Sequence, residues 1–332
     1  MNDISFERRE VRARARSGKF ANPDLTADGQ PRASVALRRL DTLWFNTGTL
    51  CNITCVNCYI ESSPTNDRLV YLSAREAAAY LDEIEALALG TREIGFTGGE
   101  PFMNPDLLAM TGDALSRGHE VLILTNAMQP MQRPRLKEGL LALRANWRDR
   151  LTLRVSLDHY SRALHESERG PGSWERTLRG LDWLSENGFR VAIAGRTCWG
   201  ENEASSRAGY ARLIAERGWP IEPDNPSQLV LLPEMDALAD VPEITESCWG
   251  ILGIHPDEVM CASSRMVVKR RGDSSPKVLP CTLLPYDRAF EMGATLEESL
   301  RADGGMFDKG AVKLCHPHCS KFCVLGGGSC SG

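Results

Sequence analysis

The sequence predicts an α/β protein whose core is a partial, TIM-like (β/α)6 barrel, followed by a cysteine-rich module. Six short apolar runs of strand length begin after residue 41, and segments of helical periodicity separate them. The alternation ends after Pro233. Strands that alternate with helices imply right-handed crossovers and a parallel sheet with the helices outside. Six units favour an open, curved barrel over a closed barrel of eight.

Each expected element has its own local signals. The expected strands are residues 43–46, 93–96, 121–125, 151–157, 190–194 and 229–232. The expected helices are residues 73–88, 106–117, 133–147, 174–187 and 204–217. Ser73 and Glu76 form a capping box at the first helix, and Gly90 is expected to end it. In the fourth helix, Leu178, Leu181 and Leu184 share one apolar face.

Composition narrows the class of protein. The chain has 332 residues, of which 42% are hydrophobic and 25% charged, with a net charge of −5. This balance is typical of a globular protein and gives no sign of a nucleic-acid or membrane surface. No apolar run is long enough for a membrane span, and the Arg-rich amino terminus lacks the apolar core of a secretory signal. We therefore expect a cytoplasmic protein.

Eleven cysteines in such a chain need an explanation, because disulfides are rare in a reducing cytosol. Cys51, Cys55 and Cys58 stand on one short loop after the first strand. Four thiolates usually saturate a 4Fe–4S cluster, so three ligands leave one iron open for an exogenous ligand. A zinc site would normally need a fourth Cys or His, and this loop has none.

A second motif follows the second strand, where Gly98, Gly99, Glu100 and Pro101 stand in sequence. Paired glycines let the backbone approach a ligand closely, and an exposed carboxylate can accept hydrogen bonds from an ammonium group. Asn126 and Asp158 follow the third and fourth strands. The carboxyl ends of barrel strands are where such folds place their chemistry.

With Asn52 after the first cysteine and Tyr59 after the last, the cysteine loop resembles the signature of the radical S-adenosylmethionine (SAM) superfamily. The Gly-Gly-Glu-Pro segment agrees with that family. The resemblance implies a SAM-binding 4Fe–4S cluster on the three cysteines. It also implies that Gly98, Gly99, Glu100 and Pro101 contribute to SAM binding. No side chain of the protein itself is assigned a catalytic role.

Further segments resemble the subgroup that includes the molybdenum-cofactor cyclase, sulfatase-maturating enzymes and peptide-modifying enzymes. They are Ser156-Leu157-Asp158, His165, Arg169-Gly170, Gly172-Ser173-Trp174 and Leu181. That resemblance implies that Asn126 and Ser156 contact SAM and that Arg169 pairs with its carboxylate. The alternatives are a polar strand end for Ser156 and a solvated charge for Arg169. The subgroup usually has Gly where this chain has His159, which is either loop variation or a residue that reaches the substrate.

The tail carries a second group of cysteines. They are Cys315, Cys319, Cys323 and Cys330, with Cys261 and Cys281 upstream. Together with Gly272 they resemble a SPASM or twitch domain, which binds auxiliary 4Fe–4S clusters. The spacings depart from the full pattern, so one auxiliary cluster is expected rather than two. The alternative is a zinc knot that uses His316 or His318 with these thiols.

These observations divide the chain into an N-terminal extension (1–40), a core barrel (41–235) and a cysteine-rich domain (236–332). The family resemblance implies an oxygen-sensitive enzyme that cleaves SAM reductively and abstracts hydrogen from its substrate, for oxidation or crosslinking. Flavodoxin or ferredoxin is the expected reductant. The extension is too short for a leader-peptide recognition domain, so a peptide and a small polar molecule are equally expected substrates. The alternative is a non-catalytic iron–sulfur or zinc sensor or scaffold.

Overall fold

The central sheet contains all six expected strands. The computed structural model describes residues 18–233 and 240–328, and within them this sheet has eight strands in the order β7-β6-β5-β4-β3-β2-β8-β9. Neighbouring strands are parallel from β7 to β8, and β9 is antiparallel to β8. The strands are β2 (Thr42–Asn46), β3 (Glu93–Thr97), β4 (Glu120–Thr125), β5 (Leu151–Ser156), β6 (Arg190–Arg196), β7 (Leu229–Leu232), β8 (Ser264–Val268) and β9 (Lys277–Leu279).

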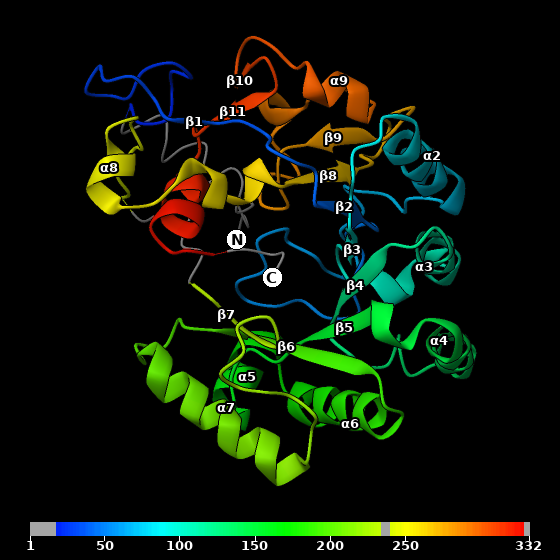
Figure 1. Cartoon of the computed structure of the whole chain (residues 1–332). Helices are drawn as coiled ribbons and strands as arrows, with labels where there is room; N and C mark the ends of the chain where they lie inside the picture. The colour runs from blue at the N-terminus through cyan, green and yellow to red at the C-terminus, as the bar shows by residue number, and fades with distance from the viewer. Residues whose placement is uncertain (1–17, 234–239, 329–332) are drawn as a thin grey trace.

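Helices cover the outer side of this curved sheet (Figure 1). The α-helices are α2 (Ala74–Ala86), α3 (Leu107–Ser116), α4 (Pro134–Trp147), α5 (Arg162–Arg169), α6 (Ser173–Glu186), α7 (Glu203–Arg217), α8 (Cys248–Leu252) and α9 (Leu296–Leu300). The shorter helical segments are η1 (Pro101–Met103), η2 (Arg148–Arg150), η3 (Pro256–Glu258), η4 (Met260–Ala262), η5 (Arg288–Phe290) and the π-helical η6 (Cys319–Val324). Among the described residues, no helix has the length and apolar character needed to cross a membrane.

The sequence predictions hold closely for the barrel. Each expected strand is found with its ends within two residues of the expected ones. The capping box of α2 is present, with the Ser73 amide donating to Glu76 and the Glu76 amide donating to the Ser73 hydroxyl. The prediction that this helix runs to Ala88 was wrong, because α2 ends at Ala86 and Ala88 has a φ of 49°. Helix α5 was not predicted, because it spans only eight residues.

The sheet is an open barrel, as predicted. Within the described ranges β7 and β9 are its edge strands, so the strands do not close into a ring. A helix lies between each consecutive pair of the six predicted strands. Because neighbouring strands are parallel, all six point their carboxyl ends to one edge. This arrangement brings the loops that follow β2, β3, β4 and β5 together at that edge.

The cysteine-rich segment adds to the same sheet, which the sequence did not reveal. Strand β8 pairs with β2 in parallel register, so the sheet continues beyond residue 235. A second sheet joins the two ends of the chain, because β1 (Ser34–Val35) pairs with β11 (Ala311–Lys313), which also pairs with β10 (Phe307–Asp308). The segment therefore gains order by packing on the barrel, and its division into separate domains stays a prediction.

The barrel interior below the site is filled by apolar side chains. Trp44, Leu122 and Met266 belong to this inner cluster, and each is almost completely buried. Gly95 makes room for the indole, because a Cβ at that position would lie 2.3 Å from the Trp44 ring. Leu124 packs against the cluster and also lines the cavity at the carboxyl edge. The cavity therefore has an apolar floor.

Candidate active site at the carboxyl ends of the strands

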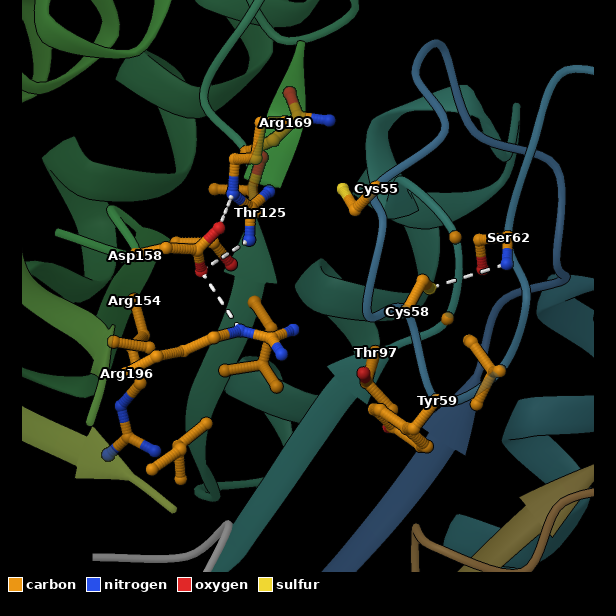
Figure 2. Close-up of a pocket in the computed structure, with 18 of the residues that line it drawn as sticks. Cys55, Cys58, Tyr59, Ser62, Thr97, Thr125, Arg154, Asp158, Arg169 and Arg196 are labelled. Atoms are coloured by element: carbon orange, nitrogen blue, oxygen red, sulfur yellow. Dashed lines mark hydrogen bonds and ion pairs between the residues drawn. The ribbon is translucent and has the colours of Figure 1, made fainter. Parts of the chain in front are cut away.

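The three cysteines of the first motif lie around one cavity. Cys51, Cys55 and Cys58 all line it. Figure 2 shows Cys55 and Cys58 on one side of this cavity and Asp158, Arg169 and Arg196 on the other. Gly98, Gly99, Asn126 and Ser156 line the same cavity from the ends of β3, β4 and β5. The structure therefore brings together most of the site residues expected from the sequence.

The two glycines hold the cysteine loop against the end of β3. Gly98 has a φ of 139°, and a Cβ there would lie 2.5 Å from the Gly48 carbonyl oxygen. A Cβ on Gly99 would lie 2.1 Å from the carbonyl oxygen of Leu50, the residue before Cys51. The Gly99 amide donates to the Gly48 carbonyl at 2.7 Å. These glycines are required by the close approach of two backbone segments, in addition to any contact with a ligand.

Glu100 is buried, contrary to the expectation of an exposed carboxylate. The residue is only 2% exposed. Its carboxylate accepts hydrogen bonds from the Thr125 hydroxyl and the Asn126 backbone amide, each at 2.8 Å. Burial raises the pKa of this carboxyl to about 7, although the hydrogen bonds oppose that rise. Glu100 and the buried Pro101 do not line the cavity. In this structure Glu100 fixes the end of β4.

Asn126 links β4 to the cysteine loop. Its side-chain nitrogen donates to the side-chain oxygen of Asn52 at 2.8 Å, and its side-chain oxygen accepts from the backbone amide of Met128. The same nitrogen lies 3.9 Å from the Cys51 sulfur. Ser156, at the end of β5, also faces the cavity. The roles of Asn126 and Ser156 as SAM contacts stay predictions.

A buried ion network lies opposite the cysteines. The Asp158 carboxylate accepts from Arg169 at 2.5 and 3.1 Å and from Arg196 at 3.3 Å. Burial by itself would raise the pKa of Asp158, but the charges of Arg169 and Arg196 lower it below its ordinary value. Both arginines line the cavity. Arg169 is therefore a cavity residue held in place by Asp158, and not a solvated surface charge.

Glu168 clamps the cysteine loop to α5, and the sequence analysis missed it. Its carboxylate accepts from the backbone amide and the side-chain amide of Asn57, both at 2.8 Å. The Asn57 carbonyl accepts from both terminal nitrogens of Arg196 at 3.2 Å. Glu168 is 3% exposed, although its sequence context does not distinguish it from a solvated helix residue. Glu168 and Arg196 together fix the loop between Cys55 and Cys58.

The donor set fits an iron–sulfur cluster with one open iron. Burial raises the pKa of the Cys51 thiol to about 12 and that of the Cys55 thiol to about 11. Such thiols ionise readily only when a metal takes the proton's place. The Cys58 sulfur accepts from the Ser62 amide at 3.3 Å, an interaction that stabilises a thiolate. Three cysteines of one loop line the cavity, Cys51 buried and Cys55 and Cys58 partly buried. The lining contains no fourth cysteine, which matches three-cysteine ligation.

The C-terminal cysteines lie close to this site. Cys261, Cys281, Cys315 and Cys319 are buried, Cys323 is partly buried, and Cys330 lies outside the described residues. Leu283 and Phe322 line the same cavity as the cysteine triplet, and each is within three residues of a cysteine. The His316 and His318 rings lie 4.7 Å apart. Within the described ranges, no group of three or more His, Cys, Asp or Glu side chains is arranged to hold a single metal ion.

A buried cation supports an anionic group in this module. Burial lowers the pKa of Arg265 to about 10, and the nearby Cys261 and Cys281 thiols oppose that change. Burial likewise raises the pKa of Cys261 to about 11, against the charge of Arg265. The charge of Arg265 would thus favour the thiolate forms that a cluster requires. The complete ligand set stays a prediction.

His159, the departure from the subgroup pattern, does not line the cavity. Its ring packs between Tyr160 and Trp199, with centroids at 4.0 and 5.0 Å. Its Nδ1 accepts from the Ser161 amide at 2.9 Å. Burial lowers the pKa of His159, although Glu201 opposes that change. His159 therefore packs in the loop after β5, away from the cavity.

Comparisons with known proteins identify the class. The model of the Radical SAM superfamily matches residues 45–203. Among curated relatives, the antilisterial bacteriocin subtilosin biosynthesis protein AlbA of Bacillus subtilis (strain 168) is 29% identical over 145 residues, which cover 43% of this chain and 30% of AlbA. The AdoMet-dependent heme synthase of Methanosarcina barkeri (strain Fusaro) is 32% identical over 147 residues, covering 43% of this chain and 38% of the synthase.

The fold comparison reaches further along the chain. The structure of Streptococcus suis SuiB bound to precursor peptide SuiA covers 91% of this chain and 72% of SuiB, with a TM-score of 0.58 and 13% identity. That likeness shows a shared fold. The matches to the two curated relatives span less than half of their length. With the three-cysteine cavity, these findings define a radical SAM barrel. Residues 45–203 therefore form a radical SAM domain.

Proposed function

We propose that this protein is an enzyme that cleaves SAM reductively and abstracts hydrogen from a peptide or small polar substrate, for oxidation or crosslinking. The observation that carries the proposal is the convergence of Cys51, Cys55 and Cys58 on one cavity lined by the glycine loop and the end of β5. A bound 4Fe–4S cluster and SAM would supply one-electron cleavage to methionine and a 5′-deoxyadenosyl radical, which removes a hydrogen atom from the substrate.

The residues of the chain would bind the cluster and SAM and position them in the cavity. Glu168, Arg196 and the glycines hold the cysteine loop through contacts within the chain, which would keep the cofactor site in a defined geometry. Arg169, Ser156 and Asn126 are the polar groups that would contact SAM. The apolar lining contributed by Leu124, Leu283 and Phe322 would limit access of water to the reacting carbon.

A peptide is the first substrate to test. Two proteins similar to this chain support a peptide substrate. AlbA is described as a bacteriocin biosynthesis protein, and SuiB has been solved bound to a precursor peptide. The heme synthase relative keeps a small molecule as the second candidate. A reductant such as flavodoxin or ferredoxin is proposed as the electron donor. The cytoplasm is the proposed location, because buried thiolate ligands need a reducing compartment.

The decisive test is reductive cleavage of SAM. Replacement of Cys51, Cys55 and Cys58 together with Ala should abolish formation of 5′-deoxyadenosine with dithionite under anaerobic conditions. Cys248→Ala is the matched control, because the Cys248 sulfur lies beside Thr245 and outside the cavity lining. This variant should cleave SAM at the rate of the unaltered chain. Cleavage at that rate by the triple variant would reject the proposal.

The C-terminal module is proposed to hold one auxiliary 4Fe–4S cluster, with ligands drawn from Cys261, Cys281 and the cysteines of residues 315–330. In the triple variant, reconstitution should then still yield about four irons and four sulfides per chain. A zinc knot would leave that variant without iron and with one tetrahedral zinc. Elemental analysis of the reconstituted triple variant distinguishes the two.

A further inference from the structure

Arg265 is a cation enclosed in the protein interior. It lies on β8, next to β2, and its side chain is among the largest that are fully buried. One terminal nitrogen donates to the carbonyl oxygens of Cys261 at 2.7 Å and Ser264 at 2.8 Å. The other donates to the Gly310 carbonyl at 3.3 Å, and Nε has no hydrogen-bond partner.

Several other enclosed cations in the described chain are paired with acids. Arg32 pairs with Glu243, Arg169 with Asp158 and Arg270 with Glu291. Within residues 18–233 and 240–328, no carboxylate forms an ion pair with Arg265. A buried charge without a counter-charge is strongly destabilising, so native proteins pair such groups or bind an ion beside them. The arrangement therefore indicates that the anion for Arg265 comes from elsewhere.

Two cysteines supply that anion when they are ionised. The guanidinium donates to the backbone carbonyl of Cys261 at 2.7 Å, so it lies beside one of the proposed cluster ligands. Thiolates at Cys261 and Cys281 would stabilise its charge. Cys261 and Cys281 are each only 6% exposed, so water would only weakly screen the attraction between their thiolates and the guanidinium. Buried thiols of this kind lose their protons when they bind a metal. The charge that Arg265 needs is thus present once the module has bound its metal.

We propose that Arg265 is the buried counter-cation of the auxiliary cluster and raises the reduction potential of that cluster. This inference rests on the auxiliary cluster of the proposed function. A thiolate-ligated cluster is anionic and gains another negative charge on reduction, so a nearby fixed cation stabilises the reduced form more than the oxidised form. Charge and hydrogen bonds around the sulfurs are known determinants of cluster potential.

The consequence concerns the direction of electron flow. Leu283 and Phe322 place this module against the cavity that holds the cysteine triplet. A raised potential favours uptake of an electron by the auxiliary cluster over release of an electron to the SAM-binding cluster. Arg265 therefore biases the module toward accepting electrons. It is a positioning residue, because it acts through the ligand thiolates and not on the substrate.

The test measures a potential and not an activity. The full chain with Cys51, Cys55 and Cys58 replaced by Ala is reconstituted anaerobically, so that only the auxiliary cluster contributes iron. Its reduced signal is followed by electron paramagnetic resonance during a redox titration. In this background Arg265→Gln removes the charge but keeps a hydrogen-bond donor, and Arg265→Lys keeps the charge. Arg270→Gln is the matched control, a buried arginine beyond the end of β8 whose partner is Glu291.

At a fixed potential, Arg265→Gln should lower the ratio of reduced to oxidised cluster at least tenfold. For a one-electron couple this corresponds to a fall of about 59 mV in the reduction potential. Arg265→Lys and Arg270→Gln should stay within a third of that shift. An unchanged potential in Arg265→Gln would overturn the inference. If Arg265→Gln fails to hold iron, Arg265→Lys decides. A normal potential in the Lys variant supports a role for charge, and loss of iron there overturns it.

Failure of the inference can be told from failure of the proposed function. A titratable iron–sulfur signal with the same potential in Arg265→Gln would reject the role of Arg265 and leave the auxiliary cluster in place. Stoichiometric zinc without iron in the triple variant would reject both the auxiliary cluster and this inference. SAM cleavage by the chain with its cysteine triplet intact tests the barrel site separately in either case.

Discussion

Arg169 in the barrel and Arg265 in the C-terminal module are both buried arginines near cysteines, yet their partners differ. The Arg169 guanidinium donates to the Asp158 carboxylate, which also binds Arg196. Among the residues that the structure describes, Arg265 donates only to backbone carbonyls. Burial disfavours the charge on both residues. Asp158 nevertheless raises the pKa of Arg169 above its ordinary value, whereas the pKa of Arg265 falls to about 10.

The difference shows two ways of preparing a site for a charged cofactor. Around the cysteine triplet, the protein neutralises its own cations with the Asp158 carboxylate. In the C-terminal module, neutralisation of the cation depends on thiolates that form when metal binds. We therefore expect the barrel site to keep its shape without metal and the C-terminal module to gain stability on loading.

The largest effect is expected from Asp158→Asn, which makes the barrel site resemble the C-terminal one. The change leaves the largely enclosed Arg169 and the partly exposed Arg196 without their shared carboxylate. Breaking a buried ion pair in this way costs about 3–5 kcal/mol in the free energy of unfolding. Urea unfolding of the metal-free chain measures it. Asp257→Asn, which breaks the exposed pair with Arg38, should cost at most about 1 kcal/mol and serves as the control. Equal losses in the two variants would contradict the comparison.

Glu100 should make the barrel region sensitive to pH. Its pKa is raised by burial to about 7 in the folded protein, from an ordinary value of 4.5. The folded state therefore holds a proton that the unfolded state releases, and stability falls as pH rises between these two values. The loss by pH 8 is about 3 kcal/mol relative to pH 4.

Urea unfolding across this pH range should show the fall in the unaltered chain and a flatter profile in Glu100→Gln. Only the slope is compared, because Gln also replaces an acceptor oxygen that the Asn126 amide uses. A profile of equal slope in the two proteins would show that Glu100 is not the titrating group.

Arg169→Ala should weaken SAM binding by about 1.5–3 kcal/mol, the range for a hydrogen bond to a charged group. The dissociation constant measured by equilibrium binding to the reconstituted protein would rise about 10- to 150-fold. Iron content should not change, because Arg196 remains beside Asp158. Arg162→Ala on the same helix removes an exposed cation paired with Glu175 and should leave affinity unchanged. Unaltered affinity in Arg169→Ala would assign that arginine to holding Asp158 alone.

The smallest effect is expected from Glu168→Gln, which keeps the shape of the clamp and one of its acceptors. The hydrogen bonds from Asn57 then no longer go to a charged carboxylate, which weakens the clamp by about 1 kcal/mol. The cysteine loop should therefore open more often, and iron should be lost to a chelator about fivefold faster. Glu175→Gln on α6 is the surface control. Equal rates of iron loss in the two variants would show that the clamp does not protect the cluster site.

Local sequence was enough to find the barrel and its first motif. Helical and strand periodicity are properties of neighbouring residues, so each barrel strand could be placed within two residues of its ends. The spacing of Cys51, Cys55 and Cys58 was sufficient to predict one cluster site, because all three ligands come from one loop. Gly98 and Gly99 were found for the same reason, although their backbone contact with Gly48 and Leu50 was not foreseen.

Contacts between distant segments were decided only by the tertiary structure. Glu168 meets Asn57 across 111 positions of sequence, and Arg265 meets Gly310 across 45. Nothing in the residues around Glu168 distinguishes a clamp from a solvated helix charge, and nothing around Arg265 shows that no acid will face it. The same holds for β8, whose place beside β2 depends on how the whole sheet is assembled. Whether a charge is paired, buried or free follows from what the fold brings against it, and that is not encoded in any short window of sequence.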